Sequence, residues 1–364
     1  MKVKDIASFL DNAVPLSFQE SYDNAGLQVG DPDRKISSAL ITLDITEETV
    51  EEAAACGCGI IIAHHPLIFT PLKNITGKTF QERIITRAIK ENIAIYASHT
   101  NLDTFNYAVS RKMAEKLSLQ NIEVLSPARG KICKLVTFVP EDHIDEVRNA
   151  VFDAGAGITG NYDRCSFNAD GTGTYRAGEG TSPYRGELGQ FHTEKEIRFE
   201  TVFLSYMKSA VLEALRNSHP YEEVAYDIYT LDNELNSSGS GCKGTLQEKI
   251  PVREFLGLLK EVFGARGIRY AGKSETYIKK VAFCGGSGAG LLGEAVKAGC
   301  DAYVTGDIKY HDFFNADGRL LFVDIGHYES EKFSTEILYE LIIKKFPTFA
   351  LRFSKTNTNP INYL

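Results

Sequence analysis

The sequence predicts an α/β core in two halves that is interrupted by an inserted α+β domain. Short apolar runs alternate with amphipathic segments before residue 128 and again after residue 243, which is typical of a parallel sheet covered by helices. Between these halves the predicted order changes to β-α-β-β-α-β, the order of a ferredoxin-like unit. We therefore expect a duplicated core at 1–128 plus 243–364, an insert at 129–236 and a linker at 237–242.

Composition excludes several classes of protein. The chain of 364 residues is long for one domain, and its 43% hydrophobic and 24% charged residues are ordinary for a soluble protein. A net charge of −8 argues against a nucleic-acid binder. No apolar run approaches the ~18 residues of a membrane helix, and the N-terminus lacks the apolar stretch of a signal peptide. Seven scattered cysteines fit free thiols, so we expect a cytoplasmic protein.

The first half begins with an amphipathic helix expected over residues 1–20. The polar stretch 23–31 is either a plain loop or a loop that presents polar groups to a cleft. The elements expected after it alternate regularly: a strand at 38–44, a helix from Thr46 to Ala55, a strand at 59–63, a helix at 80–91, a strand at 93–97 and a helix through 107–117. This alternation predicts a parallel sheet with helices on its faces.

The second half repeats the pattern. We expect strands at 280–284 and 320–325, a helix at 291–298 and a helix through 333–341, while residues 299–307 parallel residues 57–65. The glycine-rich stretch 285–290 is either a tight strand–helix turn or a phosphate cradle. It reads G-x-x-G-x-G, which is not the dinucleotide fingerprint, and no P-loop is present.

The insert has its own pattern of elements. The expected order is strand 134–139, helix 141–154, a glycine-rich hairpin, strand 198–204, helix 207–218 and strand 224–231. Within the hairpin, residues 168–173 predict a turn. The Ser/Gly-rich residues 237–241 predict a flexible exit linker.

Two adjacent histidines, His64 and His65, follow the isoleucine-rich strand directly, and Pro66 marks its end. Open α/β sheets place their ligands at the carboxyl ends of strands. Neighbours at a strand end that turns into a loop can address one cleft from two sides. The alternative is a chance pair on a loop.

Other residues able to bind a metal also follow predicted strands. His327 and Glu331 are one helical turn apart and share a face. A carboxylate has two oxygens and can bridge two cations, so a two-metal site that activates water is geometrically natural. Imidazole and carboxylate ligands suit Zn, Fe, Mn or Ni. The potential ligands are His64, His65, His99, Asp103, Asp307, His311, His327 and Glu331.

The two halves also match locally. His99-x-x-x-Asp103 corresponds to His327-x-x-x-Glu331, each directly after a strand and opening a helix. Either an internal duplication or chance explains this match. His99 lies on the same loop as Asp103, close enough to orient a ligand or move a proton, which makes it the candidate catalytic residue.

In combination these motifs identify a resemblance. The chain resembles the GTP cyclohydrolase type 2 homologue family, also called Ngg-interacting-factor-three-like proteins. The matching motifs are Asp23-Asn24-x-Gly26-Leu27-x-Val29-Gly30, Ala63-His64-His65-Pro66, Ser98-His99-Thr100-Asn101-Leu102-Asp103, Thr305-Gly306-Asp307 and Gly326-His327-Tyr328-x-Ser330-Glu331. The resemblance implies a dinuclear metal site with His64, His65, Asp103, His327 and Glu331 as ligands and Glu331 bridging.

The resemblance has further implications for assembly and the insert. The insert is similar to the domain of longer bacterial members, with folds like signalling-protein PII and copper-tolerance proteins. The motif His219-Pro220-Tyr221-Glu222 carries that likeness. Family members form hexameric rings, so we expect a homohexamer.

We expect a metal-dependent hydrolase that acts on a nucleotide-like small molecule, because five side chains shared by two divalent cations leave room for water. The alternative is a non-catalytic metal-binding scaffold or regulatory protein. We expect neither a membrane nor a nucleic acid as partner.

Overall fold

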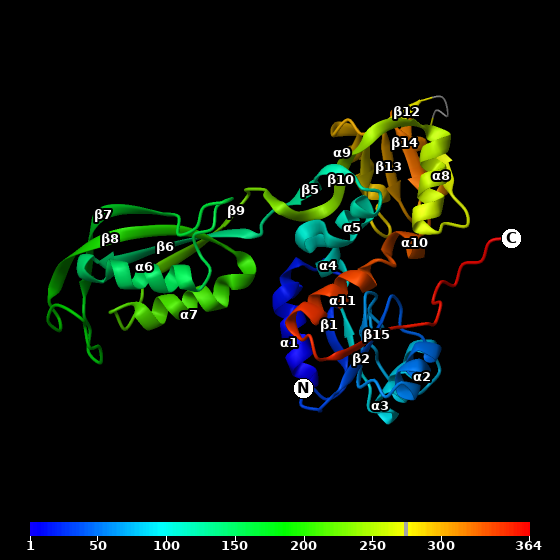
Figure 1. Cartoon of the computed structure of the whole chain (residues 1–364). Coiled ribbons are helices and arrows are strands. Elements are labelled where there is room, and N and C mark those ends of the chain that lie inside the picture. Colours follow the sequence, from blue (N-terminus) through cyan, green and yellow to red (C-terminus); the bar gives the residue numbers. More distant parts are fainter. Residues whose placement is uncertain (273–275) are drawn as a thin grey trace. The chain divides into compact units, whose positions relative to one another are not determined.

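The computed structural model describes residues 1–272 and 276–364. The chain divides into two compact units, which we describe separately: Met1–Pro127 with Asn236–Leu364, and Ala128–Leu235. Figure 1 colours the chain from blue to red along the sequence. Within the described residues, no helix is long and apolar enough to cross a membrane.

The first sheet of the larger unit has the strand order β1-β4-β3-β2-β15. Its strands are β1 (Gly26–Val29), β2 (Ser38–Thr42), β3 (Ile60–Ala63), β4 (Ala94–Ala97) and β15 (Ala350–Phe353). The last four run parallel, and β1 pairs antiparallel with β4. All four residues of β3 are buried, as expected for a parallel strand covered on both faces.

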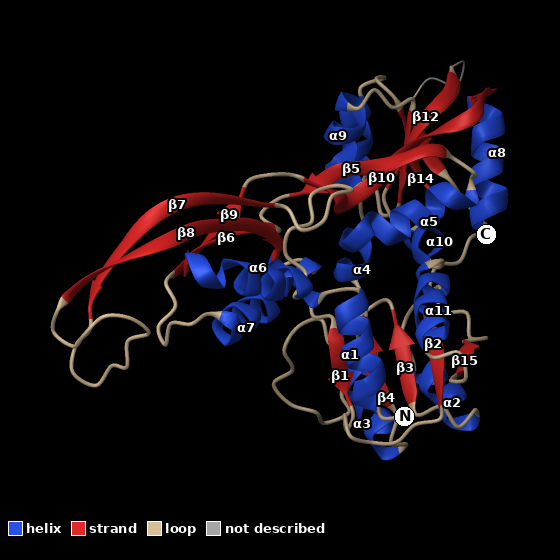
Figure 2. Ribbon diagram, turned by 60° about the vertical axis from the view of Figure 1, so that its left-hand side comes forward, coloured by secondary structure: helices blue, strands red, loops and turns tan. Residues whose placement is uncertain are grey.

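Helices cover both faces of this sheet (Figure 2). On one face lie α1 (Val3–Ala13) and α11 (Ser334–Lys345), which pack with Ile60 and Ile62 of β3. On the other face lie α2 (Glu47–Ala55) and α3 (Phe80–Lys90), which pack with Ile61. The first helix ends at Ala13 instead of continuing to residue 20, because Pro15 disfavours helical geometry in the residue before it.

The second sheet of this unit has the order β11-β14-β13-β12-β10-β5. Its strands are β5 (Gln120–Ala128), β10 (Leu235–Pro251), β11 (Arg269–Ala271), β12 (Tyr277–Phe283), β13 (Ala302–Thr305) and β14 (Leu321–Asp324). The parallel strands β12, β13 and β14 are bordered by the antiparallel β11. This is the arrangement of β2, β3, β4 and β1 in the first sheet. Helices α5 (Ala108–Lys116) and α8 (Val252–Phe263) share a core with one face, and α9 (Leu292–Lys297) shares a core with the other.

The residues predicted as a flexible linker, 237–242, are instead part of β10. From Cys242 onward this strand pairs with β12, with Cys242 opposite Phe283. At Gly241 an added Cβ would lie 2.9 Å from the carbonyl oxygen of Phe283, and φ is +68°. Glycine is needed here for the close approach of the two backbones. The prediction of a flexible linker was wrong about this stretch, because it lies in β10.

The smaller unit contains β6 (Ile132–Pro140), α6 (Ile144–Asp153), β7 (Ser166–Arg176), β8 (Phe191–Leu204), α7 (Lys208–Ser218) and β9 (Tyr226–Leu231). Its four strands form one sheet in the order β7-β8-β6-β9, with every pair antiparallel. Residues 168–173, predicted as a turn, lie inside β7. Gly173 suits its place in the strand because the Glu196 carboxylate occupies the position that a Cβ would take.

Candidate metal centre

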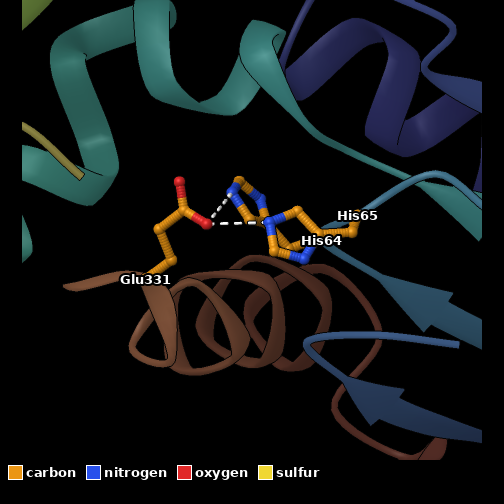
Figure 3. A group of neighbouring side chains, drawn as sticks. All are labelled: His64, His65 and Glu331. Atoms are coloured by element: carbon orange, nitrogen blue, oxygen red, sulfur yellow. Dashed lines mark hydrogen bonds and ion pairs between the residues drawn. The ribbon is translucent and has the colours of Figure 1, made fainter. Parts of the chain in front are cut away.

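The ligand-type side chains gather where parallel strands end. His64 and His65 directly follow β3, and Asp103 lies on α4 (Thr100–Thr104), just after β4. His327 and Glu331 begin and end the short helix α10 (His327–Glu331), just after β14. Both sheets of the larger unit therefore contribute. Figure 3 shows His64 and His65 directed at Glu331, and one ligand atom from each of these residues lies within 4.8 Å of the others.

Glu331 lies at the middle of the group. Its Oε2 atom is 2.7 Å from His65 Nε2 and 2.8 Å from His327 Nε2. These two imidazole nitrogens are 3.3 Å apart. The side chain of Glu331 is only 4% exposed. One buried carboxylate oxygen therefore faces two imidazole nitrogens from different sheets.

A second grouping shares the same carboxylate. His64 Nε2 is 3.7 Å from Asp103 Oδ1 and 3.9 Å from Glu331 Oε2. Both His64 Nε2 and Asp103 Oδ1 are buried and have no hydrogen-bond partner in the described part of the chain. Buried polar atoms are normally hydrogen-bonded. Two facing buried atoms without a hydrogen bond therefore indicate a further binding partner between them.

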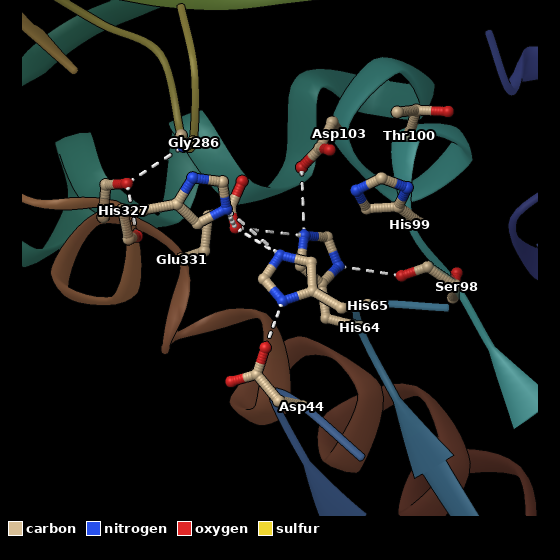
Figure 4. Close-up of polar contacts among 12 residues, drawn as sticks. Asp44, His64, His65, Ser98, His99, Thr100, Asp103, Gly286, His327 and Glu331 are labelled. Carbon is tan, nitrogen blue, oxygen red and sulfur yellow. Dashed lines mark hydrogen bonds and ion pairs between the residues drawn. The ribbon is translucent and has the colours of Figure 1, made fainter. Parts of the chain in front are cut away.

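The other nitrogen of each histidine is held in place, and Figure 4 shows this for His64 and His65. His64 Nδ1 lies 2.8 Å from the carbonyl oxygen of Ser98, which can only accept, so Nδ1 carries the proton. His65 Nδ1 bonds to Asp44 Oδ1 at 2.7 Å, and His327 Nδ1 to Asp307 Oδ2 at 2.7 Å. Metal-binding histidines characteristically donate their second N–H to a carboxylate or carbonyl in this way.

The buried carboxylate of Glu331 attracts positive charge from the imidazoles around it. Burial disfavours a protonated His65, but hydrogen bonds to Asp44 and Glu331 outweigh it and raise its pKa to about 10. The pKa of His327 is likewise raised to about 9, against its burial, by Glu331. Burial raises the pKa of Asp103. Without another cation, protons on the imidazoles supply the positive charge that Glu331 attracts.

Two of the distances match the spacing of metal ligands, while the 2.7 and 2.8 Å contacts of Glu331 Oε2 are hydrogen-bond distances. Zinc lies about 2.0–2.1 Å from nitrogen ligands, so two tetrahedral nitrogen ligands are roughly 3.3–3.4 Å apart. The nitrogens of His65 and His327 have this spacing. The 3.7 Å gap between His64 Nε2 and Asp103 Oδ1 is too long for a hydrogen bond and short enough for one cation to contact both atoms.

The glycine-rich turn has a clear structural role. An added Cβ at Gly286 would lie 2.1 Å from Glu331 Oε1, so glycine makes room for the central carboxylate. The amides of Gly286 and Gly288 donate to the hydroxyls of Ser330 and Thr305. These donors are already used, which favours the turn over a phosphate cradle at those amides.

His99 takes a different position from its counterpart His327. Its Nδ1 bonds to Asp23 Oδ1 at 2.8 Å, and its ring centroid is 5.4 Å from that of His64. Burial alone would raise the pKa of Asp23, but hydrogen bonds from His99 and Thr100 outweigh it and lower the pKa to about 2. His99 is therefore an oriented imidazole beside the ligand group.

Sequence reasoning missed the roles of Asp23, Asp44 and Asp307. Asp23 stands in the polar stretch 23–31, for which the sequence allows either a plain loop or a loop that presents polar groups to a cleft. Asp44 follows β2 as the histidines follow β3. That shared strand-end position was the available signal. Asp307, one of the predicted potential ligands, bonds to Nδ1 of the ligand-type His327. His311 is exposed, and its ring contacts are with Tyr310 and Phe314.

A cavity of about 960 Å³ adjoins the group. His65, His99 and His327 lie on its wall, together with the aromatic side chains of Phe69 and Tyr328. Such a volume lies in the range of small-molecule sites.

Comparisons with known proteins find relatives along almost the whole chain. The family model described as Duf34/NIF3 (NGG1p interacting factor 3) matches residues 1–360. A Halalkalibacterium halodurans protein named GTP cyclohydrolase 1 type 2 homolog is 41% identical over 96% of this chain and 95% of its own length. A Bacillus subtilis protein of the same name is 36% identical over 99% and 98%. The crystal structure of a Bacillus cereus protein related to NIF3 matches with a TM-score of 0.84 and 38% identity, covering 100% of this chain and 99% of that one.

Proposed function

We propose that this chain, which belongs to the Duf34/NIF3 family, is a dinuclear metal-dependent hydrolase of nucleotide-like small molecules. The observation that carries the proposal is the pair of facing, unpartnered buried atoms His64 Nε2 and Asp103 Oδ1. They share Glu331 with the second grouping formed by His65 and His327.

The residues divide into two sets of ligands. His64 and Asp103 would hold one cation, His65 and His327 the other, and Glu331 would bridge both. Bound there, two divalent cations lower the pKa of a water molecule and stabilise developing negative charge. Ser98, Asp44 and Asp307 keep each ligating histidine in the tautomer that leaves Nε2 available.

His99 is the proposed catalytic residue. Asp23 fixes its Nδ1, so its Nε2 is the atom free to take a proton from a water or to orient a substrate oxygen. His99 lies on the wall of the 960 Å³ cavity beside His65 and His327. His99 lies next to the ligand group but is not one of the proposed ligands. Its Nε2 therefore remains available for proton transfer, which a metal-bound nitrogen could not perform.

The cavity wall supports a nucleotide-like substrate. Phe69, Tyr328 and Tyr363 offer aromatic side chains to a planar ring, and Arg269, whose Nη2 is paired with Asp324, adds a cation to the wall. The name of the relatives, GTP cyclohydrolase 1 type 2 homolog, points to the same substrate class.

Assembly and evolutionary origin are part of the proposal. We propose a homohexamer, which rests on the family resemblance; light scattering that gave a monomer at micromolar concentration would refute it. The equivalent strand order of the two larger sheets supports an internal duplication, and the order β7-β8-β6-β9 supports a ferredoxin-like insert.

A turnover screen of metal-loaded protein against nucleotides, cyclic nucleotides and phosphoesters tests the enzyme proposal. Metal content is measured on the same samples, with His64→Ala and His99→Gln as variants. We expect two ions per chain in the wild type, fewer in His64→Ala, and two ions without turnover in His99→Gln. Equal turnover in wild type and His64→Ala would contradict catalysis at this site. Metal binding without any turnover would favour the scaffold alternative.

A further inference from the structure

The segment that follows β15, residues 354–363, has no helix or strand but is held by a series of side-chain bonds. Its beginning is fixed to Glu52 on α2. The hydroxyls of Ser354 and Thr356 donate to Glu52 Oε2 at 2.6 and 2.8 Å, and the amide of Lys355 donates to Oε1 at 2.7 Å. The amide of Thr356 also donates to Oε2, at 3.3 Å, so one carboxylate collects four donors and sets the direction of the segment.

The next anchor reaches the metal centre. The Thr358 hydroxyl donates to Asp44 Oδ2 at 2.6 Å. The other oxygen of Asp44 bonds to Nδ1 of His65, whose Nε2 faces Glu331. Two hydrogen bonds therefore separate the Thr358 hydroxyl from a ligand-type imidazole. A carboxylate fixed at both oxygens has less freedom to rotate. The imidazole that it holds therefore also has less freedom to rotate.

A third anchor reaches the other side of the centre. Asn359 Nδ2 donates to Glu329 Oε1 at 3.1 Å. Glu329 is buried and lies on α10 between His327 and Glu331. The amide of Ile361 in turn donates to Asn359 Oδ1 at 3.0 Å, which fixes the Asn359 side chain. Neighbouring residues of one segment thus hold groups next to ligands from both sheets.

The same segment forms part of the cavity wall. Asn359, Pro360, Ile361 and Tyr363 line the 960 Å³ cavity. An added Cβ at Gly267 would lie 2.8 Å from the Tyr363 ring, so glycine permits that close packing. The wall and the anchors belong to one continuous stretch of chain.

We propose that the 354–363 segment is a strap that positions the metal ligands, with Thr358 as a positioning residue acting on His65 through Asp44. This inference rests on the proposed metal centre and adds a function to residues outside the ligand set. Loss of the Thr358 hydroxyl leaves Asp44 Oδ2 without this donor and loosens the orientation of His65.

The chain offers a matched control. Thr356 and Thr358 are two residues apart, and each donates its hydroxyl to a carboxylate, but only Thr358 leads to the centre. The variants are Thr358→Val, which keeps the shape without the hydroxyl, Thr358→Ser, which restores it, and Thr356→Val. Zinc and manganese affinities are measured by competition with a chelator on full-length protein, alongside thermal unfolding.

We expect Thr358→Val to weaken the binding of one ion by up to about 10-fold, the lower end of the effect of removing a group that bonds a metal ligand directly, because Thr358 acts on His65 through Asp44. Thr358→Ser should recover most of this loss, and Thr356→Val should bind metal like the wild type. Wild-type affinity in Thr358→Val, or an equal loss in Thr356→Val, would overturn the strap.

A second measurement separates this inference from the metal proposal. In metal-free protein with ¹⁵N-labelled histidines, the Nδ1–H proton of His65 should exchange faster in Thr358→Val than in Thr356→Val. If the wild type binds no metal, the metal proposal fails, and this exchange rate still decides whether Thr358 positions His65. If Glu331→Gln loses metal but Thr358→Val changes neither affinity nor exchange, only the strap fails.

Discussion

Replacing Gly286 by alanine should remove metal from the centre while leaving the protein folded. The added Cβ would lie 2.1 Å from Glu331 Oε1, and contacts below 3.0 Å essentially never occur. The carboxylate must therefore retreat by about 1 Å, several times the ~0.2 Å tolerance of a metal–ligand distance. Retreat also takes Oε2 away from His65 and His327.

The cost to stability should be modest by comparison. Gly286 has φ +63°, and an L-residue in that region costs about 1–2 kcal/mol. The obstructing atom is the end of a side chain that can move. We therefore expect metal affinity to fall by at least on the order of 100-fold, with a decrease in melting temperature of only a few degrees.

The assay compares Gly286→Ala with Gly290→Ala in the same turn. An added Cβ at Gly290 meets nothing within 4 Å, so that variant should keep wild-type metal content. Metal is measured by elemental analysis and calorimetric titration, and folding by circular dichroism on metal-free samples. The reasoning is refuted if Gly286→Ala binds metal with wild-type affinity and stoichiometry, or if Gly290→Ala loses it equally.

Three further predictions concern stability and the insert. Backbone amides of Thr76 and Lys78 hold the pKa of Glu82 at about 2, below its usual 4.5, so Glu82→Gln should lower the melting temperature at pH 7. Because the folded pKa is depressed, this difference should shrink as pH falls from about 4.5 towards 2; a pH-independent difference would contradict it. Chelation should also lower the melting temperature, by the equivalent of about 2.7 kcal/mol at a free metal concentration 100 times Kd, and an unchanged scan would argue against the centre. Replacing residues 129–234 by a short Gly/Ser turn should leave a folded, metal-binding protein, because β5 and β10 are neighbours in one sheet; an unfolded product would assign the insert a structural role.

Much of the candidate centre could be predicted from the sequence. The run Gly59–Ala63 is apolar and β-branched, so it had to be a buried strand, and His64 and His65 had to follow at its end. The spacing of His327 and Glu331 placed them on one helical face, and α10 has that geometry. Local periodicity sufficed because strand ends and helix turns are set by neighbouring residues.

Only the tertiary structure decided how these ends meet. The approach of His65 to Glu331 joins residues 266 positions apart, and no local pattern encodes the distance between two sheets. The same holds for Asp44, which bonds both His65 and Thr358, and for Gly286, whose missing side chain admits Glu331. The Ser/Gly residues at 237–241 had the composition of a linker, yet they lie in β10, where Gly241 permits the close approach of two backbones. Composition indicates which conformations and contacts a residue can adopt. Only the folded chain shows which of them it does adopt.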